Sequence, residues 1–330
     1  MFKVVSLSPL PEGVIQGFFG SFLEQQRLEA KVVGVQGLKP EQIMKELADA
    51  DFVIGDYSFT IPITAEMVEA MTKVKLIQQP STGYEHIDVA ACAKKGIPVA
   101  NIGGANSISV AEHTVALALV LLKRVVYGHE KMLKGEWTQD ELMNQAAELH
   151  GKTWGVIGLG RIGRAVASRA AAFGAKVVYF DARPLPPEEE TKLGVSIRPL
   201  PKLLSESDVV SIHAPLTDQT KKMIGERELR LMRPSAVFIN PSRGELVDEA
   251  ALARAVSDGW IAGAGVDVFS KEPPGVEHPL VKAANEGANL VLTPHVAGAT
   301  NEARLRIIQV TIENVVRAMM GQNPENVVNR

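Results

Sequence analysis

Three polar side chains in the C-terminal half each follow an apolar run, and together they could carry out one reaction. Arg243, Glu272 and His295 lie in the segments Asn240-Pro-Ser-Arg243-Gly244, Asp267-Val-Phe-Ser-Lys-Glu272-Pro273 and Thr293-Pro294-His295. A guanidinium fork can pair with a carboxylate and polarise the adjacent carbonyl. An imidazole gives or takes a proton near neutral pH, and a neighbouring acid tunes it. These are the parts needed to transfer hydride to a keto acid, provided that a dinucleotide binds nearby.

A glycine motif upstream predicts that dinucleotide site. The run Gly158-Leu-Gly160-Arg161-Ile162-Gly163 lies between an apolar strand and a helix, and Asp181 follows at the end of the next strand. The glycines permit a tight turn, close approach of the pyrophosphate and packing of the helix on the sheet. The helix start, at Arg161 and Ile162, directs N–H groups toward the phosphates. Asp181 should bind the adenosine ribose and repel a 2′-phosphate, which favours NAD; Arg183 leaves NADP open, and a turn without a ligand is the alternative.

The composition narrows the class of protein. The 330 residues suffice for two domains, and 35 basic against 38 acidic residues provide no broad basic face for nucleic acid. Cys92 is the only cysteine, which excludes an intrachain disulfide and favours a reducing compartment. The N-terminus lacks a signal peptide, and the longest apolar run is far short of the ~20 residues of a membrane helix. No cluster has metal-ligand spacing, so we expect a cytoplasmic protein without a metal.

The first hundred residues alternate short strands with amphipathic helices. Apolar spacing predicts helices over 41–47 and 65–71. The strands are expected at 32–35, 51–55, 76–78 and 96–101. Alternating units of this kind predict a mostly parallel sheet.

Residues 105–150 predict a helical arm. A long helix should begin near Ser109, with Glu112 in its first turn, and it is apolar nearly all round through Leu122. Farther along, Trp137 and Met143 stand among polar residues. We expect a projecting arm that could dimerise the protein, while packing against its own chain is the alternative.

A second series of βα units occupies 151–295. Six strands are expected, at 153–157, 176–180, 208–212, 236–240, 263–267 and 290–293. Six parallel strands around the glycine motif fit a doubly wound nucleotide fold. A last helix over 302–320 carries the chain away from this sheet.

These motifs resemble those of the NAD-dependent D-2-hydroxyacid dehydrogenase family over essentially the whole chain. Besides the runs above, the matching stretches are Ser81-Thr-Gly-Tyr-Glu-His-Ile-Asp88, Asn106-Ser-Ile-Ser-Val-Ala-Glu-His-Thr114 and His213-Ala-Pro-Leu-Thr217. The resemblance implies an α/β fold of two Rossmann-like, doubly wound parallel-sheet domains with a cleft between them. Residues 1–104 and 297–330 would form the flavodoxin-like substrate domain, and 105–296 the NAD-binding domain with the arm. A homodimer is also implied.

The resemblance assigns roles to individual residues. Arg243 is expected to bind the substrate, His295 to act as the general acid in reduction, and Glu272 to raise the pKa of that imidazole and orient it. Asp267 is expected to orient the nicotinamide. Further contacts are expected from Thr82, Gly83 and Asn106 with the substrate, from Thr114 with the cofactor, and from His213 in a structural or cofactor-edge role.

The identity of the substrate rests on one loop. The phosphoglycerate dehydrogenase branch carries basic residues where this chain has Gly55-Asp-Tyr-Ser-Phe-Thr-Ile-Pro-Ile-Thr64, and no Lys or Arg lies between Lys45 and Lys73. Asp56 would repel a phosphate. We therefore expect a small unphosphorylated 2-keto acid, such as glyoxylate or hydroxypyruvate. The alternatives are a phosphoglycerate dehydrogenase and a non-enzymatic NAD-sensing interaction protein on the same scaffold.

Overall fold

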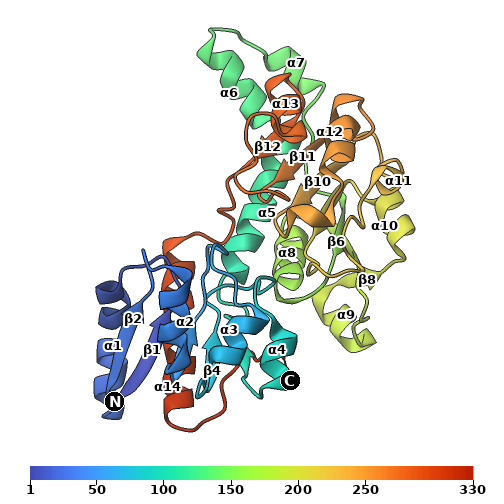
Figure 1. Ribbon diagram of the computed structural model, residues 1–330. Coiled ribbons are helices and arrows are strands. Elements are labelled where there is room, and N and C mark those ends of the chain that lie inside the picture. The colour runs from blue at the N-terminus through green and yellow to red at the C-terminus, as the bar shows by residue number, and fades with distance from the viewer. Residues whose placement is uncertain (330) are drawn as a thin grey trace. The chain divides into compact units, whose positions relative to one another are not determined.

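The computed structural model describes residues 1–329 and divides into two compact units. The first unit consists of Met1–Asn106 and the segment that begins at Asn301, and the second consists of Ser107–Thr300. Each unit contains a sheet with helices on both of its faces (Figure 1). Both units are therefore layered α/β structures.

The sheet of the first unit is wholly parallel within the described residues. Its strands run in the order β2-β1-β3-β4-β5, which is the flavodoxin-like doubly wound order. They are β1 (Phe2–Ser6), β2 (Ala30–Gly34), β3 (Phe52–Ile54), β4 (Leu76–Gln78) and β5 (Val99–Ala100).

Successive residues of these strands face opposite helical layers, as the period of two requires. On one face, Val4 and its neighbours pack against α1 (Glu12–Gln26) and α14 (Asn301–Met319). On the other face, Val5 and its neighbours pack against α2 (Pro40–Ala48), α3 (Ala65–Ala70) and α4 (Val89–Lys94). Cys92 of α4 is fully buried in this second layer, where it acts as a small apolar side chain.

The sheet of the second unit is also parallel throughout the described residues. Its order, β12-β11-β10-β9-β6-β7-β8, is the Rossmann order with one further strand at the β12 edge. The strands are β6 (Thr153–Ile157), β7 (Lys176–Phe180), β8 (Val195–Ile197), β9 (Val209–Ile212), β10 (Val237–Asn240), β11 (Gly263–Val266) and β12 (Leu290–Leu292).

Helices cover both faces of this sheet. The helices α5 (Ser107–Leu122) and α8 (Arg161–Ala172) pack on the face that contains Trp154 and Ile239. The opposite face, with Phe238 and Ile212, is covered by α10 (Leu200–Glu206), α11 (Glu226–Leu229), α12 (Glu249–Ser257) and α13 (Pro279–Asn285). The short helices α9 (Pro187–Leu193) and η1 (Gly244–Leu246) complete the unit.

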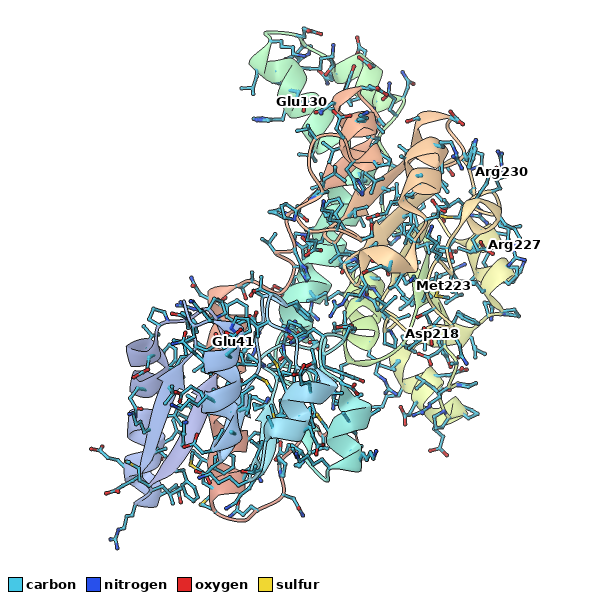
Figure 2. The ribbon with its side chains drawn as sticks, viewed as in Figure 1. Glu41, Glu130, Asp218, Met223, Arg227 and Arg230 are labelled. Atoms are coloured by element: carbon cyan, nitrogen blue, oxygen red, sulfur yellow. The ribbon has the colours of Figure 1, made fainter. Side chains whose placement is uncertain are left out.

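Two helices of the predicted arm have no buried residue. They are α6 (Val125–Leu133) and α7 (Gln139–Met143), which lie apart from both layers of their unit (Figure 1). Figure 2 shows Glu130 on α6 at the outer end of the unit. The expected long helix begins at Ser107, two residues earlier than predicted, so Glu112 lies beyond its first turn. It ends at Leu122, because Arg124 has a left-handed backbone conformation (φ 54°).

The predicted fold class is confirmed, and three elements of the fold were missed. The strand β8 was not predicted, because two of its three residues are exposed and give no apolar run. The strand β1 and helix α1 were also not predicted, although β1 lies inside its sheet between β2 and β3. Among residues 1–329 no helix is long and apolar enough to cross a membrane, and no three His, Cys, Asp or Glu side chains are grouped as a metal site.

Candidate active site

Three neighbouring strands bring the predicted chemistry to one edge of the second sheet. In the order β10-β11-β12, Arg243 follows the first strand, Asp267 the second and His295 the third. Parallel register aligns their last residues, since Asn240 pairs with Val266 and Val266 with Leu292. Ligands of open parallel sheets bind at the carboxyl ends of the strands. This edge is therefore the candidate active site.

Glu272 and His295 form a direct pair. The Nδ1 atom of His295 lies 2.8 Å from Oε2 of Glu272, and both side chains are partly exposed. The other carboxylate oxygen, Oε1, accepts the backbone N–H of Phe269 at 3.0 Å. Burial acts to raise the pKa of Glu272, but the hydrogen bonds from His295 and Phe269, together with the nearby positive charges of His295 and Arg243, hold it below its ordinary value. An ionised carboxylate on Nδ1 leaves Nε2 as the nitrogen that can exchange a proton with a substrate.

Asp267 builds the turn that carries His295. It is fully buried, and its carboxylate accepts the backbone N–H groups of Val296 and Ala297 at 2.9 and 2.8 Å and the hydroxyl of Thr293. His295 has φ 54°, a left-handed conformation that costs a non-glycine residue energy and is held by these bonds. No sequence pattern marks this supporting role. The expected contact of Asp267 with the nicotinamide stays a prediction.

Arg243 is held at the end of β10. The side-chain amide of Asn240 donates to the Arg243 carbonyl at 2.9 Å, and Nη1 of Arg243 donates to the Ser242 carbonyl at 2.6 Å. The side chain is partly buried. An arginine oriented at a strand end beside the Glu272–His295 pair can bind a carboxylate with two parallel hydrogen bonds.

The glycine motif has the shape that a dinucleotide needs. Gly158 has φ 89°, and a Cβ there would lie 2.8 Å from His213 and Ala214 backbone atoms. Gly163 has no room for a side chain either, since its Cβ would lie 2.1 Å from the Gly158 carbonyl oxygen. In contrast, a Cβ on Gly160 would meet nothing within 4 Å, which leaves space at the N-terminus of α8. The start of a helix directs N–H groups and the positive end of its dipole toward such a space, which suits a pyrophosphate.

Asp181 stands beside the same motif. Its carboxylate accepts the backbone N–H of Leu159 at 2.7 Å and that of Arg183 at 2.8 Å. The carboxylate therefore closes the turn that holds Gly158 and Gly160. Each oxygen retains a lone pair with which it can also accept a ribose hydroxyl.

Within the first unit, two of the residues predicted to bind substrate lie together. The hydroxyl of Thr82 donates to the Asn106 side-chain oxygen at 3.0 Å. Asn101 donates to the Thr82 carbonyl at 2.8 Å, and the Ser81 hydroxyl donates to the Gly83 carbonyl at 2.7 Å. These bonds order the loop that follows β4.

The carboxylate of Asp56 is turned into its own loop, and the expected repulsion of a phosphate stays a prediction. Asp56 is buried, and its carboxylate accepts the backbone N–H groups of Ser58, Thr60 and Ile61 and both hydroxyls of Ser58 and Thr60. Its charge is used to fold the loop.

Thr114 is fully buried in α5, and its hydroxyl donates to the Val110 carbonyl at 2.7 Å. Its predicted contact with the cofactor stays a prediction and requires the hydroxyl to turn away from Val110.

Comparison with known proteins identifies the family. Residues 115–297 match the model of the D-isomer specific 2-hydroxyacid dehydrogenase, NAD binding domain. A glyoxylate reductase of Korarchaeum cryptofilum is 40% identical over 291 residues, which is 87% of this chain and 85% of that protein. The chain belongs to the D-isomer specific 2-hydroxyacid dehydrogenase family. This dehydrogenase is an NAD-linked oxidoreductase of hydroxy and keto acids.

Two further similar proteins differ in the substrate that their names give. A D-3-phosphoglycerate dehydrogenase of Methanocaldococcus jannaschii is 35% identical over 330 residues, which is 100% of this chain and 60% of that protein. The crystal structure of a glyoxylate reductase from Paecilomyes thermophila gives a TM-score of 0.86 at 27% identity, covering 99% of this chain and 98% of that chain.

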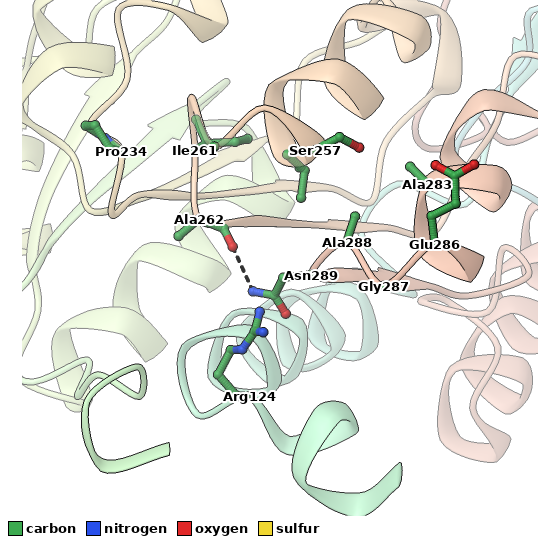
Figure 3. Close-up of a pocket in the computed structure, with 12 residues that line it drawn as sticks. Arg124, Pro234, Ser257, Ile261, Ala262, Ala283, Glu286, Gly287, Ala288 and Asn289 are labelled. Atoms are coloured by element: carbon green, nitrogen blue, oxygen red, sulfur yellow. Dashed lines mark hydrogen bonds between the residues drawn. The ribbon is translucent and has the colours of Figure 1, made fainter. Parts of the chain in front are cut away.

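A hollow in the second unit lies apart from this site. It has a volume of about 480 Å³ and is lined by residues such as Arg124, Ala262 and Asn289 (Figure 3). Asn289 donates to the Ala262 carbonyl at 2.9 Å. Ala262 and Asn289 precede β11 and β12, so the hollow lies at the amino ends of these strands, opposite the catalytic edge.

The backbone of His213 packs against Gly158 in the glycine turn, and its side chain is partly buried. Its Nε2 lies 2.9 Å from the Ser211 hydroxyl, and burial lowers its pKa to about 3. An unfolded chain binds a proton at this histidine below about pH 6.5, which the folded chain does not. The resulting stabilisation is present above pH 6.5 and is lost as the pH falls toward 3.

We therefore expect the unfolding free energy to fall on acidification from pH 6.5, with a contribution from His213 of up to about 1.4 kcal/mol per pH unit. His213→Gln should remove that contribution. Urea unfolding of both proteins at pH 7, 6, 5 and 4 measures it, and equal slopes for the two proteins would contradict this account.

Proposed function

We propose that the protein reduces a small unphosphorylated 2-keto acid, with glyoxylate and hydroxypyruvate as the first candidates. The observation that carries the proposal is the Glu272–His295 pair at the same sheet edge as Arg243. The glyoxylate reductases among the relatives support it. The loop over 55–64 supports it further, because it contains no Lys or Arg that could bind a phosphate.

Each residue of the trio has one task in this reaction. Arg243 binds the substrate carboxylate and polarises the carbonyl. His295 donates its Nε2 proton to the carbonyl oxygen as that oxygen gains negative charge. Glu272 holds the imidazole through Nδ1 and favours its protonated form. NADH, when bound, supplies the hydride that the carbonyl carbon receives. The backbone N–H groups of Thr82 and Gly83 are proposed to hold the substrate carboxylate, and Asn106 is proposed to contact the substrate.

A panel of keto acids tests the proposal. NADH oxidation would be followed with glyoxylate, hydroxypyruvate, pyruvate, 2-ketoisocaproate, oxaloacetate and phosphohydroxypyruvate. We expect one of the unphosphorylated acids to give the highest kcat/KM. Phosphoglycerate dehydrogenase is the second candidate, because relatives with that activity match the whole chain. Turnover of phosphohydroxypyruvate at low concentration, with glyoxylate and pyruvate inert, would choose it instead.

The preference for NAD over NADP is proposed to depend on the Asp181 charge. Asp181→Asn keeps oxygen and shape but removes the repulsion of a 2′-phosphate. We expect the ratio of kcat/KM for NADH to that for NADPH to fall roughly ten-fold, which corresponds to about 1.4 kcal/mol. Glu188→Gln, at a charged position in α9, is the matched control. An unchanged ratio in Asp181→Asn would exclude this role.

We also propose that the arm forms a homodimer interface in the cytoplasm. Large apolar side chains are exposed on and beside α6 and α7, with Trp137 at 77%, Leu133 at 74% and Met143 at 70%. Contiguous exposed apolar surface marks an interaction site. Trp137→Glu combined with Leu133→Glu should halve the mass measured by light scattering, whereas a monomeric wild-type protein would refute the proposal. The single, buried cysteine supports a reducing compartment.

A further inference from the structure

A second acid–histidine pair lies beside the loop that carries Glu272, and none of the steps above uses it. The Nε2 atom of His278 lies 3.2 Å from Oε2 of Glu249, and their side chains are only 9% and 11% exposed. Glu249 is the first residue of α12, and His278 directly precedes α13. Burying two such polar groups costs desolvation free energy unless other contacts satisfy them, so the further contacts of Glu249 and His278 show what the pair holds in place.

The position of the Glu272 carboxylate depends on the backbone at Phe269. Oε1 accepts the Phe269 N–H at 3.0 Å, while Oε2 meets Nδ1 of His295 at 2.8 Å. A shift of the Phe269–Ser270 segment would therefore move the carboxylate relative to the imidazole.

Glu249 holds that segment. One of its carboxylate oxygens accepts the backbone N–H of Ser270 at 2.9 Å, and the other accepts the Ser270 hydroxyl. These bonds span 21 residues of sequence, from the start of α12 to the loop after β11. A carboxylate with donors on both oxygens is fixed in direction.

His278 fixes Glu249 in turn. Its Nε2 lies 3.2 Å from Oε2 of Glu249, within ion-pair distance, on the side of the ring that faces the carboxylate. Its Nδ1 is buried with no hydrogen-bond partner among the described residues. The His278 ring also packs edge-on against the Phe269 ring, with 5.4 Å between centroids.

The peptide bond between Phe269 and Ser270 lies against Gly244, the residue that follows Arg243. A Cβ on Gly244 would lie 2.1 Å from both the Phe269 carbonyl carbon and the Ser270 nitrogen. Only glycine permits this approach. The Phe269–Ser270 peptide therefore contacts the segment that follows Arg243, and the adjacent Val268–Phe269 peptide donates its N–H to Glu272.

We propose that Glu249 and His278 are positioning residues, which fix the backbone of Phe269 and Ser270 and so set the Phe269 N–H that orients the Glu272 carboxylate against His295. The inference rests on the proposed roles of Glu272 and His295. It extends the catalytic arrangement by two residues that contact neither substrate nor cofactor.

A double-mutant cycle tests this inference. Glu249→Gln keeps the volume but loses an acceptor for Ser270 and His278. We expect kcat for keto-acid reduction to fall roughly ten-fold, with the Kd of NADH unchanged. The pH at which the reduction rate is half lost should move down, as it should in Glu272→Gln. In the Glu272→Gln background, Glu249→Gln should lower kcat by less than two-fold, because both variants remove the same interaction.

If Glu249→Gln does not fold, two other substitutions test the positioning role. Ser270→Ala removes one hydrogen bond, and His278→Leu removes the imidazole that lies against Glu249. Both should lower kcat in the wild-type background but not in the Glu272→Gln background. His278→Gln, which can still donate, should recover part of the loss. Effects that multiply with Glu272→Gln, or a lowered unfolding temperature with unchanged kcat and pH profile, would overturn the inference.

Failure of the inference can be told from failure of the proposed function. If Glu272→Gln and His295→Gln leave kcat unchanged, the proposed catalytic roles are wrong. If they lower kcat and Glu249→Gln does not, only the positioning role is wrong. Glu226→Gln, at the first residue of α11 and paired with Arg230, is the matched control, with kcat expected at the wild-type value.

Discussion

Replacing His295 with glutamine is expected to lower kcat for keto-acid reduction by roughly 10²–10⁴, the range attributed to general acid catalysis. Glutamine can still hydrogen-bond to Glu272 but cannot supply a proton to the carbonyl oxygen. The Kd of NADH, measured by fluorescence titration, should change little, because the glycine motif and Asp181 remain intact. Since His295 is partly exposed, the unfolding midpoint should also stay close to that of the wild type.

The matched control for this variant is His129→Gln. His129 is an exposed histidine of α6, in the same unit as His295. It should retain the wild-type kcat. A His295→Gln enzyme that turns over at a rate near that of the wild type would show that another group donates the proton.

Arg243→Ala is expected to lose substrate affinity and turnover together. The guanidinium is proposed to bind the carboxylate in the ground state and to stabilise the developing oxyanion, so KM should rise while kcat falls on the order of 10²–10³. Arg243→Lys preserves the charge but not the planar fork. It should therefore recover only a small part of the loss.

Steady-state kinetics of the two Arg243 variants, at saturating NADH, measure this effect. Arg233→Ala and Arg233→Lys serve as controls, since Arg233 pairs with Asp208 away from the catalytic edge. A lysine variant with wild-type kcat/KM would mean that charge alone suffices, and the proposed two-point contact with the carboxylate would be wrong.

Strands and helices could be predicted from the sequence where a local apolar pattern marks them. The strands β6 and β7 have the predicted bounds because each is a continuous apolar run next to the glycine motif. The strand β8 was missed, since Ser196 and Ile197 are exposed and edge position rather than burial defines it. The break at Arg124 was missed for a different reason: no glycine or proline marks it, and only the backbone conformation shows it.

The residues of the site could be named from sequence, but the contacts that hold them could not. Arg243, Glu272 and His295 stand in recognisable runs. The role of Asp267 in the His295 turn depends on hydrogen bonds 26 to 30 residues apart in sequence. The link from Glu249 to Ser270 depends on two strand ends meeting at one edge of the sheet. Such contacts leave no periodic pattern in the chain.

The position of Asp56 shows how burial alters an electrostatic argument. In the sequence it is an acid in a loop without cations, which suggested repulsion of a phosphate. In the structure its carboxylate accepts hydrogen bonds from Ser58, Thr60 and Ile61. Those bonds lower its pKa although burial acts to raise it, and they leave the carboxylate turned into the loop.

The most direct test of the central claim follows the hydride itself. The enzyme would be given NADH carrying deuterium at both C4 positions of the nicotinamide, together with glyoxylate, and the product examined by mass spectrometry and NMR. We predict glycolate with one deuterium on C2, and a rate of NADH oxidation that falls by roughly 10²–10⁴ with His295→Gln. Tight binding of NADH with no deuterated 2-hydroxy acid from glyoxylate or from any other acid of the panel would contradict the account.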